Sequence, residues 1–120
     1  LAIPPARDWL RRKGIYLSGM LVGGTTITGA PIDQMFVHLV NRASVAEQAL
    51  VREGDIITAI DGKDTKSHDD LIAALKGKEN KEIEITIKRE RAKARLRYDH
   101  FVRRLDVDDV LVIDETGVRR

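Results

Sequence analysis

The chain has 120 residues, of which 42% are apolar, with 21 basic and 19 acidic side chains and no cysteine. This length predicts one domain with a modest core and a short extension, and the apolar fraction argues against disorder. The lack of cysteine excludes disulfides, thiol catalysis and thiolate metal sites. No apolar run approaches the roughly 18 residues of a membrane-spanning helix, and a net charge of +2 is a weaker excess than nucleic-acid binders usually concentrate.

The N-terminal segment predicts a connector. Residues 4–14, PPARDWLRRKG, favour a short helix, because prolines stand at its entry, its last turn is basic and Gly14 can end it. The first residue is Leu1 rather than methionine. We therefore expect a fragment of a longer polypeptide, with any targeting signal outside it.

Long and β-branched apolar residues predict a strand over Ile15–Val22, but Ser18 and Gly19 interrupt it. Glycine inside a strand often marks a bulge or the close approach of another backbone. A loop over residues 23–35 follows, and a second strand is expected over residues 36–41.

Two capping boxes predict two helices. Ser44 with Glu47 opens a short helix, and Ser67 with Asp70 opens the main helix, which ends at Gly77. The segment IITAID between them is typical of a third strand, and the Asp-Gly that closes it is a turn signal.

Period-two alternation predicts a hairpin after the main helix. Ile83, Ile85 and Ile87 alternate with polar residues, which implies one buried face. The segment AKARLRY, residues 92–98, alternates again after a turn. The tail, residues 99–120, contains a further strand candidate, VLVID, to which we assign no place.

Basic residues on the second arm of this hairpin are the best argument for an acidic partner. They are Arg91, Lys93, Arg95 and Arg97. Four positive charges on one face of a strand could contact phosphates. However, hardly any aromatic residue interleaves with them, and Glu82 and Glu84 can face them from the paired strand. We interpret them as a solvated, charge-paired face and expect no nucleic-acid partner.

The order of elements is strand, strand, short helix, strand, helix, strand, strand. This order predicts an antiparallel-rich α+β domain, with a small sheet curled over two helices. Such a sheet leaves strand edges. An edge that stays open can bind an extended peptide.

Three segments, SVAEQALVREGDIITAIDG, SHDDLIAALKG and EIEITIKRE, closely resemble a PDZ domain of the bacterial kind. In that family a short helix precedes a Gly-Asp that opens a strand ending in Asn/Asp-Gly, and a helix and a hairpin follow. The resemblance implies a small, partly open antiparallel β-barrel or sandwich capped by two helices, in the circularly permuted bacterial strand order. It divides the chain into a connector helix (1–14), a PDZ domain (15–98) and a C-terminal extension (99–120).

Within that family the chain is similar to the PDZ domains of HtrA/Deg-like serine proteases. Their Tyr-aliphatic-Gly-aliphatic loop corresponds to the run YLSG, in which serine stands where glycine is usual and glycine where an aliphatic residue is usual. A shift of one residue in this alignment would bring Gly19 to the position of the usual glycine. Backbone N–H groups in such a loop hold a peptide's C-terminal carboxylate, the peptide backbone pairs with the open edge of the next strand, and its last side chain enters an apolar slot beside the main helix. The resemblance implies these peptide-binding residues: Tyr16, Leu17, Ser18, Gly19, Met20, Leu21, Val22, His68, Ile72 and Leu75.

The helix residues in that set share one face. His68, Ile72 and Leu75 stand at i, i+4 and i+7, whereas Leu71 and Ala74 turn more towards the core. We expect Leu17, Met20, Val22, Ile72 and Leu75 to form the pocket walls, although Met20 and Val22 also suit a plain core strand. His68 matches a position where some PDZ domains select Ser or Thr in the ligand, and it equally suits an exposed site beside the cap.

Catalysis is poorly supported by the sequence. It contains no nucleophile elbow, no phosphate-binding loop and no metal-ligand spacing, so we expect no cofactor and no metal. If the parent protein is a protease, as the resemblance implies, its catalytic residues lie outside this chain.

Three functions remain open. The first is a peptide-binding module of an HtrA/Deg-like serine protease, which binds C-terminal or exposed apolar segments of unfolded substrates. The resemblance implies that such a module recruits substrates or regulates the protease domain, and that it works in the periplasm or cell envelope. The second is a PDZ-like assembly or docking domain that binds no peptide, which gains support if residues 99–120 cover the open edge. The third is the PDZ domain of another envelope protease or of a secretion component.

Overall fold

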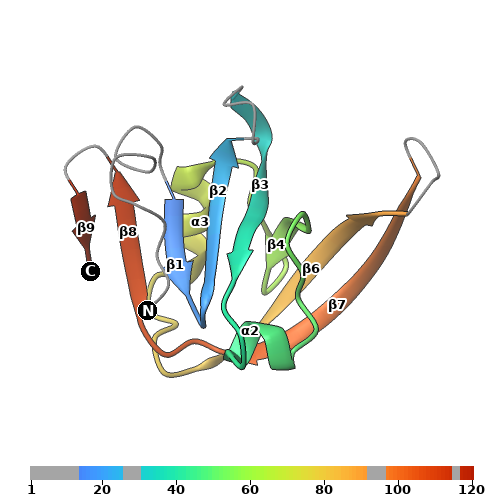
Figure 1. Ribbon diagram of the computed structural model, residues 1–120. Coiled ribbons are helices and arrows are strands. Elements are labelled where there is room, and N and C mark those ends of the chain that lie inside the picture. Colours follow the sequence, from blue (N-terminus) through green and yellow to red (C-terminus); the bar gives the residue numbers. More distant parts are fainter. Residues whose placement is uncertain (1–13, 26–30, 92–96, 115–116) are drawn as a thin grey trace.

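The computed structural model describes residues 14–25, 31–91, 97–114 and 117–120 (Figure 1). Within these residues it contains nine strands and two helices. They are β1 (Gly14–Leu17), β2 (Met20–Thr25), β3 (Pro31–Val40), α2 (Val45–Gln48), β4 (Ile56–Ile60), β5 (Lys63–Asp64), α3 (His68–Leu75), β6 (Glu82–Glu90), β7 (Tyr98–Asp106), β8 (Val110–Asp114) and β9 (Gly117–Arg119). The predicted connector helix lies outside the described residues except for Gly14, which begins β1.

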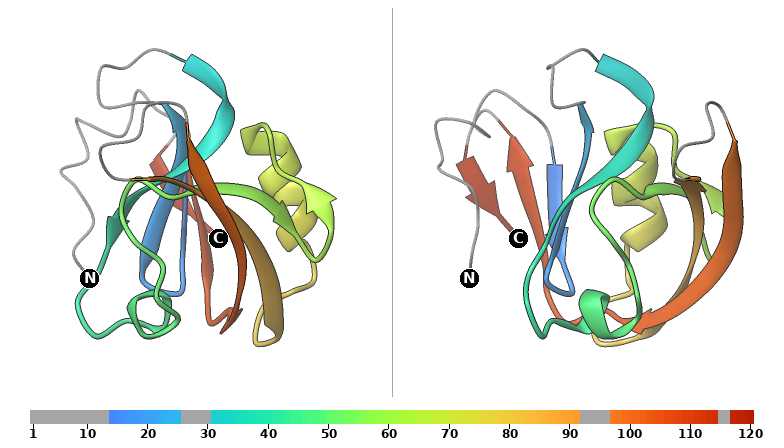
Figure 2. Two further views of the ribbon diagram at one scale, coloured as in Figure 1. Left: turned by 90° about the vertical axis from the view of Figure 1, so that its right-hand side faces the viewer. Right: turned by 45° about the vertical axis from the view of Figure 1, so that its right-hand side comes forward.

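The strands form one sheet in the order β7-β6-β4-β3-β2-β1-β8-β9, with β5 paired to β4 off this path. Every pair is antiparallel. The sheet curls round without closing into a barrel, and the two short helices pack against it (Figure 2). The predicted fold class, a partly open antiparallel α+β domain, is confirmed. No helix in the described part of the chain is long and apolar enough to cross a membrane.

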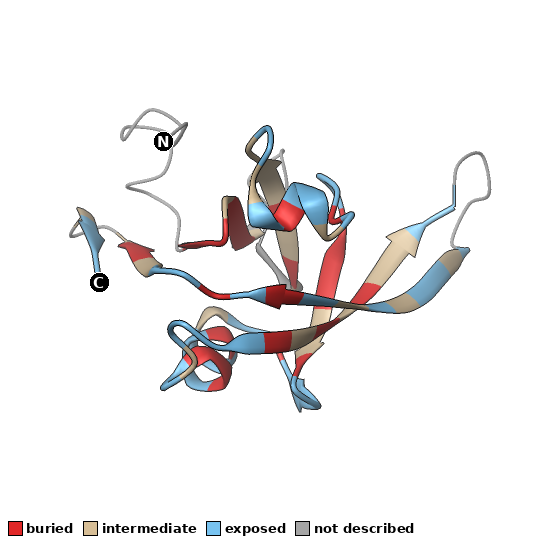
Figure 3. Cartoon of the chain, turned by 90° about the horizontal axis from the view of Figure 1, so that it is seen from below, coloured by how far each residue is buried: buried red, intermediate tan, exposed pale blue. Residues whose placement is uncertain are grey.

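The core forms from the residues whose period predicts burial. In β6 the three isoleucines Ile83, Ile85 and Ile87 are almost fully buried, and the residues between them are more exposed. They share one cluster with Leu71 and Leu75 of α3. Buried residues gather where the strands cross in the middle of the molecule, and the β6–β7 pair runs out from there into exposed positions (Figure 3).

The serine half of both predicted capping boxes is confirmed, whereas the acid of each accepts from the residue before the cap, Ala43 N–H at 2.8 Å and Lys66 N–H at 3.2 Å. The Ser44 hydroxyl accepts a hydrogen bond from the Glu47 N–H at 3.1 Å, and the Ser67 hydroxyl accepts one from the Asp70 N–H at 3.1 Å. These side chains satisfy N–H groups that the first turn of a helix leaves without partners. After α3 the chain turns at Gly77, whose φ is +76°.

The C-terminal third differs from its prediction. β6 pairs with Tyr98–Asp106 in continuous register, from Glu90 opposite Tyr98 to Glu82 opposite Asp106. Residues 92–96 of the hairpin strand predicted over 92–98 lie outside the described residues, and its last residue, Tyr98, begins β7. The boundary placed after residue 98 falls inside the sheet, at the first residue of β7.

Only part of the predicted charge pairing on this hairpin can be compared with the structure. Lys93 and Arg95 lie outside the described residues. Glu84 pairs with Arg104 across the ladder at 3.3 Å, and Arg91 pairs with Asp99 at 3.6 Å. The partner of Glu84 is therefore a residue of the tail, which the prediction had left without a place.

Candidate functional site

Ser18 and Gly19 form a two-residue turn between β1 and β2. Leu17 and Met20 are the opposed residues that flank it, and the φ angles of Ser18 and Gly19 are +52° and +85°. Two positive φ angles in a two-residue hairpin loop match the type I′ turn, whose twist suits the flanking strands. The run that was predicted to be a cradle for a peptide carboxylate is a hairpin turn.

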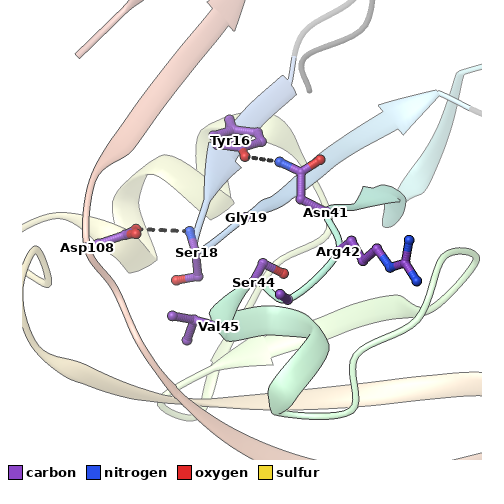
Figure 4. Close-up of a pocket in the computed structure, with 9 residues that line it drawn as sticks. Tyr16, Ser18, Gly19, Asn41, Arg42, Ser44, Val45 and Asp108 are labelled. Atoms are coloured by element: carbon purple, nitrogen blue, oxygen red, sulfur yellow. Dashed lines mark hydrogen bonds between the residues drawn. The ribbon is translucent and has the colours of Figure 1, made fainter. Parts of the chain in front are cut away.

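The polar groups of this turn are held by three other parts of the chain. The Ser18 N–H donates to Asp108 Oδ1 at 3.2 Å, and the Ser18 hydroxyl donates to the Asp106 carbonyl at 2.6 Å. The Ser18 carbonyl accepts from the Ala46 N–H at 2.9 Å, and the Gly19 carbonyl accepts from the Asn41 N–H at 2.8 Å. A carboxylate of the chain itself therefore takes the Ser18 donor that the prediction gave to a ligand (Figure 4).

The edge of β2 is not open. β2 pairs with β1 along one side and with β3 along the other. Met20, Leu21 and Val22 have no exposed surface. The prediction of an open edge at these residues is wrong, because the residues just before them fold back as a neighbouring strand. Whether any of the three contacts a peptide stays a prediction.

β1 lies where the prediction placed a ligand. It runs antiparallel to β2, and α3 lies behind β1 and β2 in Figure 1 and close to β1. Ile15 and Leu17 belong to the same buried cluster as Leu71 and Leu75 of α3. An extended, apolar segment of the chain thus pairs with the strand, and packs in one cluster with the helix, that were predicted to bind a peptide.

The three predicted helix residues lie along one face of α3, but they differ in burial. Leu75 is buried with Leu71 and Ala74 in the core. Ile72 is 36% exposed, and His68 is half-buried at the start of α3. The helix presents positions 71, 74 and 75 to the sheet, so Leu75 turns inward while Ile72 stays at the surface.

β8 covers the other side of β1. It pairs with β1 from Leu17 opposite Val110 to Gly14 opposite Ile113. On the face away from α3, Tyr16, Leu21 and Ile113 form a second small buried cluster. β8 comes from the tail that the sequence left unplaced, but it covers the outer edge of β1, whereas the edge of β2 is covered by β1 itself.

A hollow of about 570 Å³ opens beside the turn. It is lined by Tyr16, Ser18, Gly19, Asn41, Arg42, Ala43, Ser44, Val45 and Asp108. Its two charged residues point differently, since Asp108 reaches Ser18 while Arg42 extends away from this contact (Figure 4). The negative charge at the turn disfavours a second carboxylate there.

Tyr16 borders the hollow, and its hydroxyl accepts a hydrogen bond from the Asn41 amide. Burial raises the pKa of this hydroxyl, the hydrogen bond with Asn41 lowers it, and the charge of Asp108 raises it further, with a net upward shift. Tyr16 is therefore neutral over the physiological range and acts as a positioned hydrogen-bonding group.

Sequence reasoning missed Asn41, Arg42 and Asp108 as neighbours of the turn. Asp108 stands 90 residues from Ser18 in the sequence. The strand predicted at VLVID, just after Asp108, was the available sign that this region joins the sheet, because a strand needs a pairing partner.

The three serines have structural roles in the fold. Ser44 and Ser67 cap helices, and the Ser18 hydroxyl is bonded to a carbonyl. No three His, Asp or Glu side chains in this part of the chain are grouped closely enough to hold a metal ion.

A family model described as PDZ domain matches residues 36–89. The match begins within β3 and ends within β6, so it contains α2, β4, β5 and α3. The PDZ-like fold predicted from the sequence is confirmed. The hairpin β1–β2 and the strands β7 to β9 lie outside the match.

Two solved structures have a similar fold. One is described as photosystem II D1 C-terminal processing protease, with a TM-score of 0.57 and 20% identity over 83% of this chain and 24% of that chain. The other is the PDZ domain of a carboxy-terminal protease from Vibrio cholerae in complex with peptide, with a TM-score of 0.54 and 17% identity over 81% of this chain and 94% of that chain. This chain spans about a quarter of the first protein, and at these identities the likeness shows the fold alone. No curated protein matches the sequence.

Proposed function

From this PDZ-like fold we propose that the chain is a peptide-binding module of a larger protease, which holds apolar or C-terminal segments of other proteins by β-strand addition. The observation that carries the proposal is the position of β1. An extended apolar segment already lies antiparallel to β2 with its side chains against α3. This arrangement supports a slot between β2 and α3 with the shape and chemistry for an extended peptide.

The side chains of β1 define the ligand that such a slot prefers. Ile15 and Leu17 point to the cluster shared with α3, and Tyr16 points to the opposite face. In β-strand addition, main-chain hydrogen bonds give affinity and alternate side chains give specificity. A matching peptide therefore has aliphatic residues at its last and third-last positions.

We further propose that the parent protein is a serine endopeptidase of the periplasm or cell envelope. The sequence favours an HtrA/Deg-like parent, and the two similar structures favour a carboxy-terminal processing protease. Either parent would use the module to recruit substrate or to regulate its protease domain. The adjoining sequence decides, since a trypsin-like double barrel and a Ser-Lys dyad differ in their motifs.

A second candidate function is a PDZ-like assembly or docking domain that binds no free peptide. One observation favours it, namely that β2 is paired along both sides and has no open edge. In that case β1 and β8 are permanent parts of the sheet.

A peptide titration separates the two functions. The chain is titrated, up to millimolar concentration, with labelled peptides that end in Val, Leu or Phe, each with a free and with an amidated C-terminus. Peptide binding predicts saturable binding that prefers the aliphatic endings. Absence of binding for every peptide contradicts the module and supports the assembly domain, and indifference to amidation removes carboxylate recognition from the proposal.

A further inference from the structure

We propose that β1 is an internal ligand, which fills the peptide site between β2 and α3 and keeps it closed until β1 is released. The inference rests on the proposed function and names the regulation of that site. Its basis is a coincidence of three features in β1: strand direction, side-chain chemistry and position beside α3.

The direction and register of β1 are those of a bound peptide. Leu17 stands opposite Met20, the first residue of β2, and Ile15 stands opposite Val22. A peptide that adds to β2 in antiparallel register ends at this same place. Leu17 is 1% exposed and Ile15 fully buried, so little of the slot is left for a second segment.

The chain fastens β1 at both of its sides. β2 pairs with one edge, and β8 pairs with the other over the whole length of β1. At its end, the Asp108 carboxylate accepts from the Ser18 N–H and also from the Asp109 N–H at 2.8 Å. A ligand carboxylate at this turn therefore has to displace Asp108 as well as β1.

The turn that joins β1 to β2 is a point where the closure can be weakened. Gly19 has a φ of +85°, and a Cβ atom there would lie 2.1 Å from the Ser44 Cβ. Gly54 has a nearly equal φ of +88°, but a Cβ atom there meets nothing within 4 Å. Alanine brings the same backbone strain to both positions and a steric clash to Gly19 alone.

A free peptide can replace the contacts that β1 makes in the site. The segment is only four residues long, and an added peptide of the same sequence restores the same pairing with β2 and the same side chains in the slot. Its affinity is then lowered by the fraction of molecules in which the site is open. Closing or opening the site therefore changes affinity without changing the contacts of the bound peptide.

The first arm of the experiment locks β1. Gly14 and Gly23 stand directly opposite each other in β1 and β2, and opposed residues have Cα atoms about 4.5–5.5 Å apart, within the range of a disulfide. Because the chain has no cysteine, the double variant Gly14→Cys/Gly23→Cys forms one defined bond. Its oxidised and reduced forms are compared in the same preparation, so each is the control of the other.

The second arm weakens β1. Gly19→Ala is compared with the matched control Gly54→Ala, with circular dichroism to check the fold and amide hydrogen exchange to follow residues 14–17. The probe for both arms is a fluorescein-labelled peptide of the β1 sequence, Gly-Ile-Tyr-Leu, with a free C-terminus. Peptides ending in Val and Phe are tested in parallel.

We expect the oxidised double variant not to bind, the reduced form to bind, and Gly19→Ala to bind about tenfold tighter than Gly54→Ala, as a larger open fraction requires. Equal binding by oxidised and reduced forms, or by the two alanine variants, overturns the internal ligand while the peptide-binding function stands. If no form binds any peptide, the proposed function itself fails. If Gly19→Ala does not fold, the oxidised and reduced forms decide alone.

Discussion

Two regions of the sheet differ in how their strand edges are protected. At one end β7 pairs only with β6 among the described residues, and its exposed residues include Asp99, Arg104 and Asp106 as well as Val102. Towards the other end the apolar strand β2 is covered first by β1 and then by β8, and the sheet ends at the short strand β9. Charge on an edge strand discourages pairing with another chain. The chain thus leaves open the edge that attracts few partners and covers the edge that would attract them.

The difference indicates that the closed end, β1 with β2 and β8, is protected by packing, and that the open end, β7, is protected by its charged side chains. Substitutions of matched kind at the two ends should therefore have different effects on stability. The following variants test this difference from the largest expected effect to the smallest.

The largest contrast is expected between Leu17→Ala and Val102→Ala. Leu17 is 1% exposed in the core, and removing it leaves a cavity, so we expect a loss of about 4 kcal/mol in the free energy of unfolding. Val102 on β7 is 44% exposed, and its loss should cost less than about 0.5 kcal/mol. Urea unfolding measures both, and equal losses would contradict the comparison.

Two acidic residues give the next contrast. Asp55 is 1% exposed and accepts two hydrogen bonds from Arg89, at 2.6 and 2.8 Å. Asp55→Asn leaves the Arg89 charge poorly paired, and a loss of about 3 kcal/mol is expected. Glu84 pairs with the exposed Arg104, so Glu84→Gln should cost less than about 1 kcal/mol.

The Asp55 pair also connects the open end to the core. The Arg89 guanidinium lies 4.5 Å from the centre of the Phe101 ring in β7. High salt should reduce the effect of Glu84→Gln and leave that of Asp55→Asn nearly unchanged, because exposed pairs are screened more than buried ones. Unfolding at two salt concentrations checks this, and a strongly salt-dependent Asp55 effect would argue against a buried pair.

A smaller effect is expected from the two adjacent acids before β8. Asp108→Ala removes the acceptor for the N–H groups of Ser18 and Asp109 and should cost about 1 kcal/mol. Asp109→Ala removes only a contact with exposed Arg120 at 3.4 Å and should be close to neutral. Thermal unfolding compares them, and the reverse order would mean that Asp108 does not fasten the turn.

The two regions should also respond to opposite extremes of pH. The backbone N–H of Glu84 and the side chain of Lys78 lower the pKa of Asp61 below its ordinary 3.8. Its stabilising contribution is present above that value and is lost as the pH falls through the lowered pKa. Asp61→Asn should therefore flatten the acid limb of the stability curve.

The pH dependence of stability expected from Tyr16, at the closed end, has the opposite sign. Its pKa is raised above 10, chiefly by burial, so its contribution is present below pH 10 and is lost as the pH rises through the raised value. Tyr16→Phe should flatten the alkaline limb and leave the acid limb unchanged. Stability measured at both extremes for both variants checks these signs, and a response at the wrong extreme would contradict them.

Local features of the fold were predictable from the sequence. The caps at Ser44 and Ser67 and the buried isoleucines of β6 follow from short-range rules, since their partners lie within a few residues. Ser18-Gly19 was recognised as an interruption, but small residues with positive φ suit a hairpin turn as well as a carboxylate loop. The choice depends on whether the chain folds back, which no neighbouring residue determines.

Long-range pairing was not predictable. Nothing near VLVID indicates that β8 pairs with β1, because any apolar strand of suitable length fits a free edge. The difference in burial between Ile72 and Leu75 has a related cause, because it depends on which face of α3 packs against the strands. Short-range rules therefore predicted the helix α3 and the interruption at Ser18-Gly19, but not the strands that lie beside them.

The pairing of β1 with β8 has a consequence for the order of folding. The contact between Ser18 and Asp108 closes a loop of 90 residues, and such closure is entropically unfavourable until other contacts are in place. On the ribosome, β1, β2 and α3 emerge well before β8. During synthesis the nascent hairpin therefore has one unprotected side, and docking of β8 is the step that ends its exposure to other chains.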